Sequence, residues 1–241
     1  MKKAASFALG CKVNQYESEA IAELFAEKGY EIVGIDEEAD VYVINTCTVT
    51  NFGDKKSRQL IRKVKRQNEN AIVAVVGCYA QTAPKELMEI AGVNLVIGTK
   101  DRAQIVEMVE QYDRANGVEN HVSDIMKERV FEPLSIQKLA NRTRAYLKIQ
   151  DGCSQYCSYC IIPYARGPIR SREPQEVVAE VKRLAENGFK EVVLTGIHVA
   201  SYGKDRRDTS LPDILKQVHE VEGIERIRFS SIEPNVVTEE F

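Results

Sequence analysis

Asp151-Gly-Cys-Ser-Gln-Tyr-Cys-Ser-Tyr-Cys160 comes directly after a short apolar stretch, Arg144-Ala-Tyr-Leu-Lys-Ile149. The ten residues hold Cys153, Cys157 and Cys160 in a C-x3-C-x2-C spacing. Three thiolates on one tight loop can bind three irons of a cubane iron–sulfur cluster and leave the fourth iron open. An open coordination position is typical of a reactive metal site, whereas structural sites are usually closed by four ligands. The alternative is that these are buried apolar cysteines whose spacing is accidental.

The composition is that of a folded protein with room for two medium domains. The chain has 241 residues, of which 44% are hydrophobic and 29% charged. Its net charge of -3 provides no global basic field, so a nucleic-acid partner would have to meet local basic patches. We find no secretion signal and no apolar run near the roughly 18 residues of a membrane span. Six cysteines in such a chain indicate the reducing cytoplasm, so we expect a cytoplasmic protein without membrane contact.

Strands and helices alternate through the first part of the chain. The segment Ala71-Ile-Val-Ala-Val-Val76 is continuous and apolar, as expected for a parallel strand that is buried on both faces. This rhythm predicts an open, doubly wound parallel sheet in a first domain at 1–140. Strands are predicted at 4–9, 40–45, 71–76 and 94–97, and helices at 16–28, 55–66, 84–90 and 102–112.

A second βα series forms the expected second domain, 141–241. Residues 113–142 have no sustained period and are predicted to be a connector that can add irregular strands. The second series is too short for a closed barrel, which needs roughly 200 residues or more. We therefore expect the first part of a (β/α) partial barrel, truncated relative to a longer enzyme. Its strands are predicted at 144–149, 191–194 and 226–231, and its helices at 175–186 and 212–221.

The other three cysteines each come after a predicted strand of the first domain. They are Cys11, Cys47 and Cys78. Open parallel sheets bind ligands outside the carboxyl ends of their strands, so the three thiols can converge although they are far apart in sequence. The pattern predicts a second cluster with three thiolate ligands. The alternatives are three independent buried cysteines or a zinc site with a fourth ligand, although the three histidines stand at no ligand-like spacing.

Both cysteine sets resemble one known family. A C-x3-C-x2-C loop after a first barrel strand resembles the radical S-adenosylmethionine (SAM) superfamily. Leu9-Gly-Cys-Lys-Val-Asn-Gln-Tyr-Glu-Ser18, Asn45-Thr-Cys47 and Val76-Gly-Cys-Tyr79 resemble the N-terminal domain of the methylthiotransferases, and the resemblance covers essentially the whole chain. Members of that family usually continue through the rest of the barrel into a small C-terminal β domain that grips RNA.

The first two cysteine motifs also discriminate among the branches of this family. Gly10-Cys-Lys-Val-Asn-Gln15 and Asn45-Thr-Cys-Thr-Val-Thr-Asn51 are most similar to the MtaB branch. That resemblance implies addition of a methylthio group to C2 of N6-threonylcarbamoyladenosine, position 37, next to the tRNA anticodon. It also implies two [4Fe–4S] clusters, two SAM molecules and an electron donor, with the tRNA anticodon loop as partner.

Other functions stay open at this stage. Within the family, the substrate could be another tRNA adenosine derivative or an aspartate of a ribosomal protein. A non-catalytic iron–sulfur electron carrier is a function of another class, but such carriers normally close their clusters with four cysteines. A zinc-bearing RNA-binding module is a third hypothesis.

The resemblance also implies roles for residues around the cysteine loop. Tyr159 would lie near the adenine of SAM, Thr195 and Gly196 near its amino group, and Glu233 near its ribose or sulfonium. Arginine forks suit carboxylates and phosphates, so Arg170 and Arg172 would bind the SAM carboxylate or an RNA phosphate. The alternatives are ordinary packing, a strand-end turn and solvated arginines.

Three further features lead to predictions of their own. The polar residues beside the first three cysteines, Asn14, Gln15, Asn45 and Thr48, can orient the base or hydrogen-bond the sulfurs. The basic helix at 54–66 is either a contact for tRNA phosphates or a solvated face. His198 and His219 are predicted to be ordinary surface or loop residues.

Overall fold

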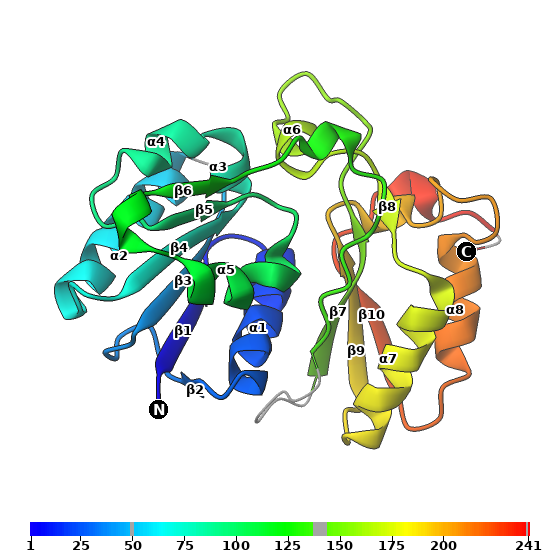
Figure 1. Ribbon diagram of the computed structural model, residues 1–241. Coiled ribbons are helices and arrows are strands. Elements are labelled where there is room, and N and C mark those ends of the chain that lie inside the picture. Colours follow the sequence, from blue (N-terminus) through cyan, green and yellow to red (C-terminus); the bar gives the residue numbers. More distant parts are fainter. Residues whose placement is uncertain (49–50, 137–143, 240) are drawn as a thin grey trace.

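The structure, a computed structural model, describes residues 1–48, 51–136, 144–239 and 241. Two β-sheets with their helices lie side by side, the first built from residues before 137 and the second from residues after 143 (Figure 1). The predicted domain boundary at 140/141 lies among residues 137–143, outside the described residues.

The first sheet has the predicted open parallel architecture. Its strand order is β2-β1-β3-β4-β5-β6, and all of these pairs are parallel. The central strands are almost wholly buried, which explains their continuous apolar sequences. The strands are β1 (Lys3–Ala8), β2 (Glu31–Ile32), β3 (Val41–Thr46), β4 (Ile72–Gly77), β5 (Leu95–Ile97) and β6 (Glu119–His121).

Helices cover both faces of this sheet. Ile21 and Phe25 of α1 join the core on one face together with α5, whereas Ile61 and Val64 of α2 pack on the other face near α4. The helical segments are α1 (Lys12–Glu27), α2 (Asn51–Gln67), α3 (Cys78–Thr82), α4 (Pro84–Met88), η1 (Arg102–Gln104), α5 (Ile105–Gln111), η2 (Arg114–Asn116) and η3 (Ile125–Lys127).

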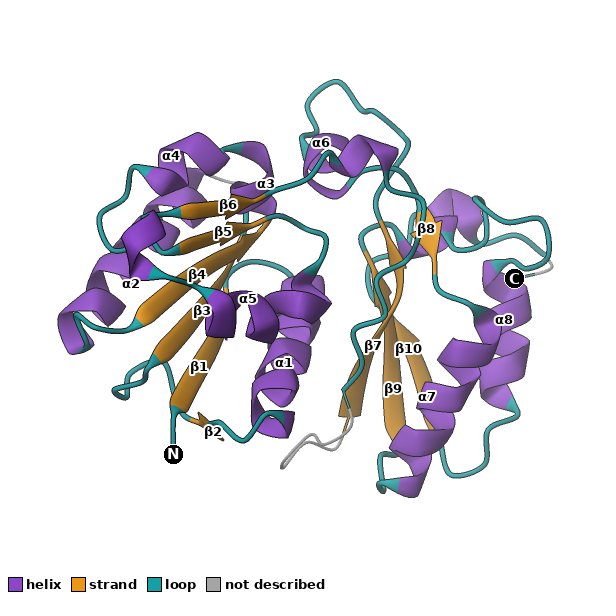
Figure 2. Cartoon of the chain, in the orientation of Figure 1, coloured by secondary structure: helices purple, strands orange, loops and turns teal. Residues whose placement is uncertain are grey.

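The second sheet is open, as expected for part of a barrel. Its order is β10-β9-β7-β8, in which β8 runs antiparallel to β7 and the other pairs are parallel. Helices α7 and α8 lie along its outer face (Figure 2). The elements are β7 (Arg144–Asp151), α6 (Ile162–Arg166), β8 (Arg170–Ser171), α7 (Pro174–Glu186), β9 (Glu191–Gly196), η4 (Val199–Ser201), α8 (Leu211–His219), β10 (Arg226–Phe229) and η5 (Pro234–Val236).

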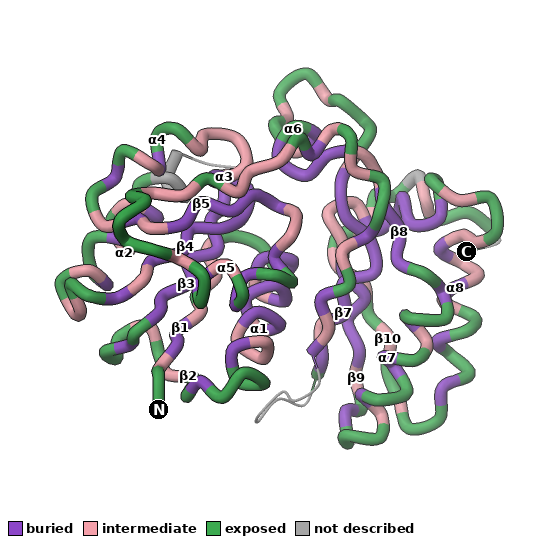
Figure 3. The backbone as a smooth tube through the Cα atoms, in the orientation of Figure 1, coloured by how far each residue is buried: buried purple, intermediate pink, exposed green. Residues whose placement is uncertain are grey.

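Helix α1 belongs to the cores of both domains. Tyr16 and Ala20 lie in one apolar cluster with side chains of β7, β9, α7 and α8. The Tyr16 hydroxyl donates to the backbone oxygen of Leu134 at 2.5 Å and lies 3.3 Å from the Glu180 carboxylate. Figure 3 shows buried residues along both α1 and β7. Because one helix packs against both sheets, the two domains form a continuous buried interface.

No helix within the described residues combines the length and the apolar character needed to cross a bilayer.

The central strand β3 should dominate the stability of the first domain. Ile44 is fully buried, so Ile44→Ala should lower the free energy of unfolding by about 2–5 kcal/mol through lost burial and a cavity. Ile32 lies on the edge strand β2 and is 41% exposed, so Ile32→Ala should cost about 1 kcal/mol or less. Urea denaturation of the purified variants measures both values, and equal losses would contradict the observed strand order.

Candidate cysteine sites at the domain interface

Cys11, Cys47 and Cys78 stand at the carboxyl ends of neighbouring parallel strands. Cys11 caps the start of α1 just beyond β1, Cys47 comes directly after β3, and Cys78 comes directly after β4 and opens α3. The chain passes from β1 to β2 on one side and then to β3 on the other, so the strand order reverses between β1 and β3. Ligands of open α/β sheets bind at such switch points. The sheet topology therefore gathers this set as the sequence predicts.

Gly10 brings the loop of Cys11 onto Cys47. Its φ of +98° lies in the region that favours glycine, and a Cβ there would stand 2.6 Å from the Cβ and 2.7 Å from the Sγ of Cys47. Only a residue without a side chain allows this close approach.

Asn14 ties the ends of β1 and β3 together beside these cysteines. Its amide nitrogen donates to the backbone oxygens of Leu9 and Thr46, each at 2.8 Å. Its oxygen lies 3.7 Å from the Sγ of Cys11, within hydrogen-bonding distance for sulfur. The sequence-based expectation that Asn14 can hydrogen-bond a cysteine is thus met by the geometry.

Cys78 receives a hydrogen bond from the other domain. The Nε of Arg166, at the end of α6, donates to the Sγ of Cys78 at 3.1 Å. Both side chains are buried, and burial raises the pKa of the Cys78 thiol to about 11. The first set of cysteines therefore lies against the domain interface.

The second set of cysteines occupies the loop after β7. Cys153, Cys157 and Cys160 are partly exposed, and the backbone nitrogen of Cys160 donates to the oxygen of Cys157 at 2.9 Å. Gln150 braces the start of this loop, because its amide nitrogen donates to the backbone oxygens of Asp151 at 2.7 Å and Gly152 at 2.6 Å.

The donor chemistry of both sets suits iron–sulfur clusters. All six cysteines are free thiols, and soft thiolate donors are the ligands that such clusters take from a protein, here in sets of three that would leave one iron open. Across the described ranges, no three Cys, His, Asp or Glu side chains already stand as a group that could hold a metal ion. The two sets therefore fit the group by donor type and chain topology, and binding would have to draw the sulfurs together.

Thr195 and Gly196 lie where β9 ends beside this loop. The Thr195 hydroxyl is buried and has no hydrogen-bond partner within the described part of the chain. An unsatisfied buried polar group calls for an explanation, and a ligand-binding position provides one. A Cβ on Gly196 would stand 2.7 Å from the Oε1 of Gln150, so a glycine here permits the brace of the cysteine loop.

Glu233 approaches the cysteine loop through His198, which the sequence did not mark as a site residue. The Nε2 of His198 lies 3.3 Å from the Glu233 carboxylate and 3.1 Å from the side-chain nitrogen of Gln155, which lies within the loop. His198 lies in the loop after β9, as predicted, and it links Glu233 to the cysteine loop. Its position just after the strand-end Gly196 was the available signal. Tyr159 is 90% exposed, and its expected place near an adenine stays a prediction.

Arg170 and Arg172 are buried and bound to protein groups. Arg170 donates to the backbone oxygen of Pro168 at 3.0 Å and lies 3.7 Å from Asp151. The guanidinium of Arg172 lies 2.5 Å from the carboxylate of Glu180 on α7. The interpretation of these residues as solvated arginines is wrong, since both are 2–3% exposed. In this structure Arg172 serves the packing between β8 and α7.

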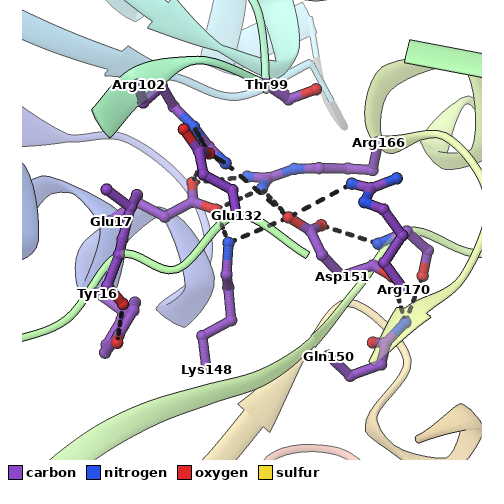
Figure 4. Close-up of polar contacts among 12 residues, drawn as sticks. Tyr16, Glu17, Thr99, Arg102, Glu132, Lys148, Gln150, Asp151, Arg166 and Arg170 are labelled. Carbon is purple, nitrogen blue, oxygen red and sulfur yellow. Dashed lines mark hydrogen bonds and ion pairs between the residues drawn. The ribbon is translucent and has the colours of Figure 1, made fainter. Parts of the chain in front are cut away.

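A buried network of charges, which no sequence pattern predicted, lies between the two domains (Figure 4). The Glu17 carboxylate of α1 lies 2.6 Å from Arg102, 2.9 Å from Lys148 and 2.6 Å from Arg166. Asp151 at the end of β7 shares all three of these cations, with Lys148 at 3.1 Å, Arg166 at 3.5 Å and Arg102 at 3.9 Å. Glu17 comes from the first domain, and Lys148 and Arg166 come from the second. The network therefore joins the domains next to both cysteine sets.

Opposing effects act on the carboxylates of this network. Burial by itself would raise the pKa of Glu17 and of Asp151. The neighbouring cations outweigh that effect and hold the pKa of both carboxyls below their usual range. Both groups are therefore charged at neutral pH.

Gly152 should be indispensable to the cysteine loop. Its φ is +71°, and a Cβ there would stand 1.9 Å from the backbone oxygen of Pro168. Gly152→Ala should lower the free energy of unfolding by roughly 3 kcal/mol or more. Gly188 has a similar φ of +87° but nothing within 4 Å, so Gly188→Ala should cost only about 1 kcal/mol. Equal losses in thermal denaturation would mean that the close contact at Gly152 is absent.

Replacing Glu17 by a neutral residue should leave the buried cations Arg102, Lys148 and Arg166 without one of their carboxylate partners. Glu17→Gln should destabilise the protein by about 3–5 kcal/mol at neutral pH. The parent should lose stability as the pH falls below about 5, because carboxylates with depressed pKa values must then take up protons. Glu17→Gln should flatten part of that acid slope, whereas Glu27→Gln, at an exposed position of the same helix, should leave it unchanged. Denaturant titrations at several pH values provide the comparison.

Each half of the chain matches a known protein family. Residues 3–98 match a family described as "Uncharacterized protein family UPF0004", and residues 147–240 match the radical SAM superfamily. A solved radical SAM methyltransferase, TsrM from Kitasatospora setae, shares the fold with a TM-score of 0.57 at 16% identity. The match covers 90% of this chain and 51% of that one.

Curated relatives align along nearly the whole of this chain. The "Threonylcarbamoyladenosine tRNA methylthiotransferase MtaB" of Bacillus subtilis is 52% identical over 100% of this chain and 53% of the relative. The protein of the same name from Aquifex aeolicus is 42% identical over 95% and 56%. A "tRNA-2-methylthio-N(6)-dimethylallyladenosine synthase" of Dictyoglomus thermophilum is 34% identical over 95% and 53%. The chain spans about half the length of these relatives, and it belongs to the radical SAM methylthiotransferase family.

Proposed function

We propose that this chain is the first part of an enzyme that adds a methylthio group to C2 of N6-threonylcarbamoyladenosine at position 37, next to the tRNA anticodon. The observation that carries the proposal is a contact between the domains: Arg166, which comes six residues after Cys160, donates to the sulfur of Cys78. The names of the relatives at 52% and 42% identity support the choice of substrate.

At the first site, Cys153, Cys157 and Cys160 would hold a [4Fe–4S] cluster with one open iron. When bound, that cluster supplies the electron for reductive cleavage of SAM. The chain's own residues shape the place where SAM would bind. Gln150 holds the start of the cysteine loop, and the unpartnered hydroxyl of Thr195 provides a hydrogen-bonding group toward SAM.

Glu233 and His198 border the same site. Their side chains lie 3.3 Å apart, and His198 also contacts Gln155 of the cysteine loop. A carboxylate is a suitable acceptor for the hydroxyls of a ribose, so Glu233 would bind that part of SAM, with His198 fixing its direction. Tyr159, exposed beside Cys160, would stack on the adenine.

At the second site, Cys11, Cys47 and Cys78 would hold the cluster that provides the sulfur. The buried charges close this part of the interface to bulk solvent, since Glu17, Arg102, Lys148 and Arg166 are fully buried. Exclusion of water matters because a reactive intermediate must reach its target without side reactions. The reaction also needs an electron donor, and the reducing cytoplasm suits the free thiols.

Helix α2 is the candidate contact for the tRNA backbone. Arg62 and Arg66 are exposed and line a surface hollow together with Lys63 and Ala91. Other cations of this helix are partly neutralised, since Arg58 lies 2.7 Å from Glu86. The exposed arginines would bind phosphates without reading the base sequence, and that contribution weakens as salt is added.

Anaerobic reconstitution of the longest natural form of the protein tests this function. It should bind about eight irons, from two cubane clusters. Replacing Cys11, Cys47 and Cys78 by alanine should remove about four of them, and so should replacing Cys153, Cys157 and Cys160. With SAM, dithionite and tRNA, mass spectrometry of the nucleosides should show methylthiolated threonylcarbamoyladenosine only for the parent.

Each other outcome has a definite meaning. About four irons in the parent would overturn the two-cluster proposal. Zinc without acid-labile sulfide would indicate the RNA-binding module. Methylthiolation of dimethylallyladenosine instead would assign the protein to the branch of the Dictyoglomus thermophilum relative. Two loaded clusters with no modified tRNA would favour the protein-aspartate branch or the electron carrier.

A further inference from the structure

We propose that Arg166 is a positioning residue that couples the two cysteine sites, by donating a hydrogen bond to the Cys78 sulfur and so setting the reduction potential of the cluster held there. The inference rests on the proposed function in one respect, namely that Cys11, Cys47 and Cys78 bind a cluster. It assigns to the second domain a direct influence on a site built from the first.

The backbone around Arg166 is held against the first domain. Helix α6 packs on α3, the helix that Cys78 opens. The Thr99 hydroxyl, from the first domain, donates to the backbone oxygen of Ala165 at 2.8 Å. Gly167 has a φ of +69°, and a Cβ there would stand 2.4 Å from the backbone oxygen of Ile125. The side chain of Arg166 therefore starts from a fixed point.

The guanidinium of Arg166 has an acceptor at each of its three nitrogens. Nε donates to the Sγ of Cys78 at 3.1 Å, Nη1 to Glu17 at 2.6 Å and Nη2 to the Asn14 oxygen at 2.5 Å. The Asn14 oxygen is also the neighbour of Cys11. The planar fork thus contacts Cys78 directly and Cys11 through Asn14, an arrangement that the single ammonium of a lysine cannot reproduce.

The same guanidinium reaches toward the loop of the other site. It lies 3.5 Å from Asp151, two residues before Cys153, and Arg166 itself is six residues after Cys160 along the chain. Its position in the chain and its contacts therefore both connect the cysteine loop to Cys78.

Hydrogen bonds and positive charge at a cluster sulfur favour the reduced, more negative state of the cluster. Arg166 supplies both in a buried setting where charge is poorly screened. Its removal should therefore move the potential of the cluster at Cys11, Cys47 and Cys78 to a more negative value. An uncharged residue that served only to join the domains would leave that potential unchanged.

Lys148 provides the matched control. It is as buried as Arg166 and contacts the same carboxylates, Glu17 and Asp151, yet its ammonium makes no hydrogen bond to a sulfur of the described residues. Lys148→Met should weaken the interface without changing the hydrogen bond to Cys78.

The experiment uses the longest natural form of the protein with Cys153, Cys157 and Cys160 replaced by alanine, so that one cluster remains. In redox titrations followed by electron paramagnetic resonance, Arg166→Gln should shift the reduction equilibrium about tenfold, or about 59 mV, toward negative potential. Arg166→Lys should give a smaller shift in the same direction, and so should Lys148→Met, which removes a buried charge but no hydrogen bond to sulfur. No shift in the Arg166 variants, or an equal shift for Lys148→Met, would overturn the proposal.

A measurement without any substitution covers the case in which the variants fail to fold. In protein labelled with [15N]arginine, electron–nuclear double resonance of the reduced cluster should show coupling to a guanidinium nitrogen at hydrogen-bonding distance. Absence of that coupling in a loaded cluster would also overturn the proposal. Absence of any cluster in the parent would instead mean that the proposed function has failed, so the two failures are distinguishable.

Discussion

The Glu17 carboxylate is the point on which the two halves of this protein depend. It is fully buried, forms an ion pair with Arg102 of its own domain, and accepts hydrogen bonds from Lys148 and Arg166 of the other. Buried charges are tolerated only when they are completely paired, because each unpaired one loses its hydration without compensation. The relative placement of the two domains seen here satisfies this condition, and α1 carries both Glu17 and the apolar residues that pack on each sheet.

That placement decides what the cysteines can do. The switch point of the first sheet gathers Cys11, Cys47 and Cys78, but the topology of one sheet says nothing of a second site. The domain interface connects the second cysteine set to the first. Helix α6 comes after the loop of Cys153, Cys157 and Cys160, and it ends at Arg166, which donates to the Cys78 sulfur. The Cys78 thiol and the buried charges around Glu17 are thereby connected directly through Arg166.

Local sequence patterns predicted most strands and helices, but they did not predict which charged residues pair over long distances in the chain. The βα rhythm correctly predicted most helices and seven strands, which are β1, β3, β4, β5, β7, β9 and β10, and both cysteine sets follow predicted strands. Short strands such as β8 were missed because two residues carry no period. Lys148 interrupts an apolar strand, and its partner Glu17 stands 131 residues away, so nothing local identified the pair. The burial of Arg172 and the contact between His198 and Glu233 were not predicted for the same reason, since the partners come from other elements.

The central claim is that two cluster sites face each other across the interface with Arg166 between them. An anaerobic crystal structure of the longest natural form, with anomalous scattering measured at the iron absorption edge, tests it most directly. We expect two separate iron peaks, one at each cysteine set, with the Arg166 guanidinium against the Cys78 sulfur. Iron at Cys153, Cys157 and Cys160 alone, or two sites turned away from a common interface, would contradict it.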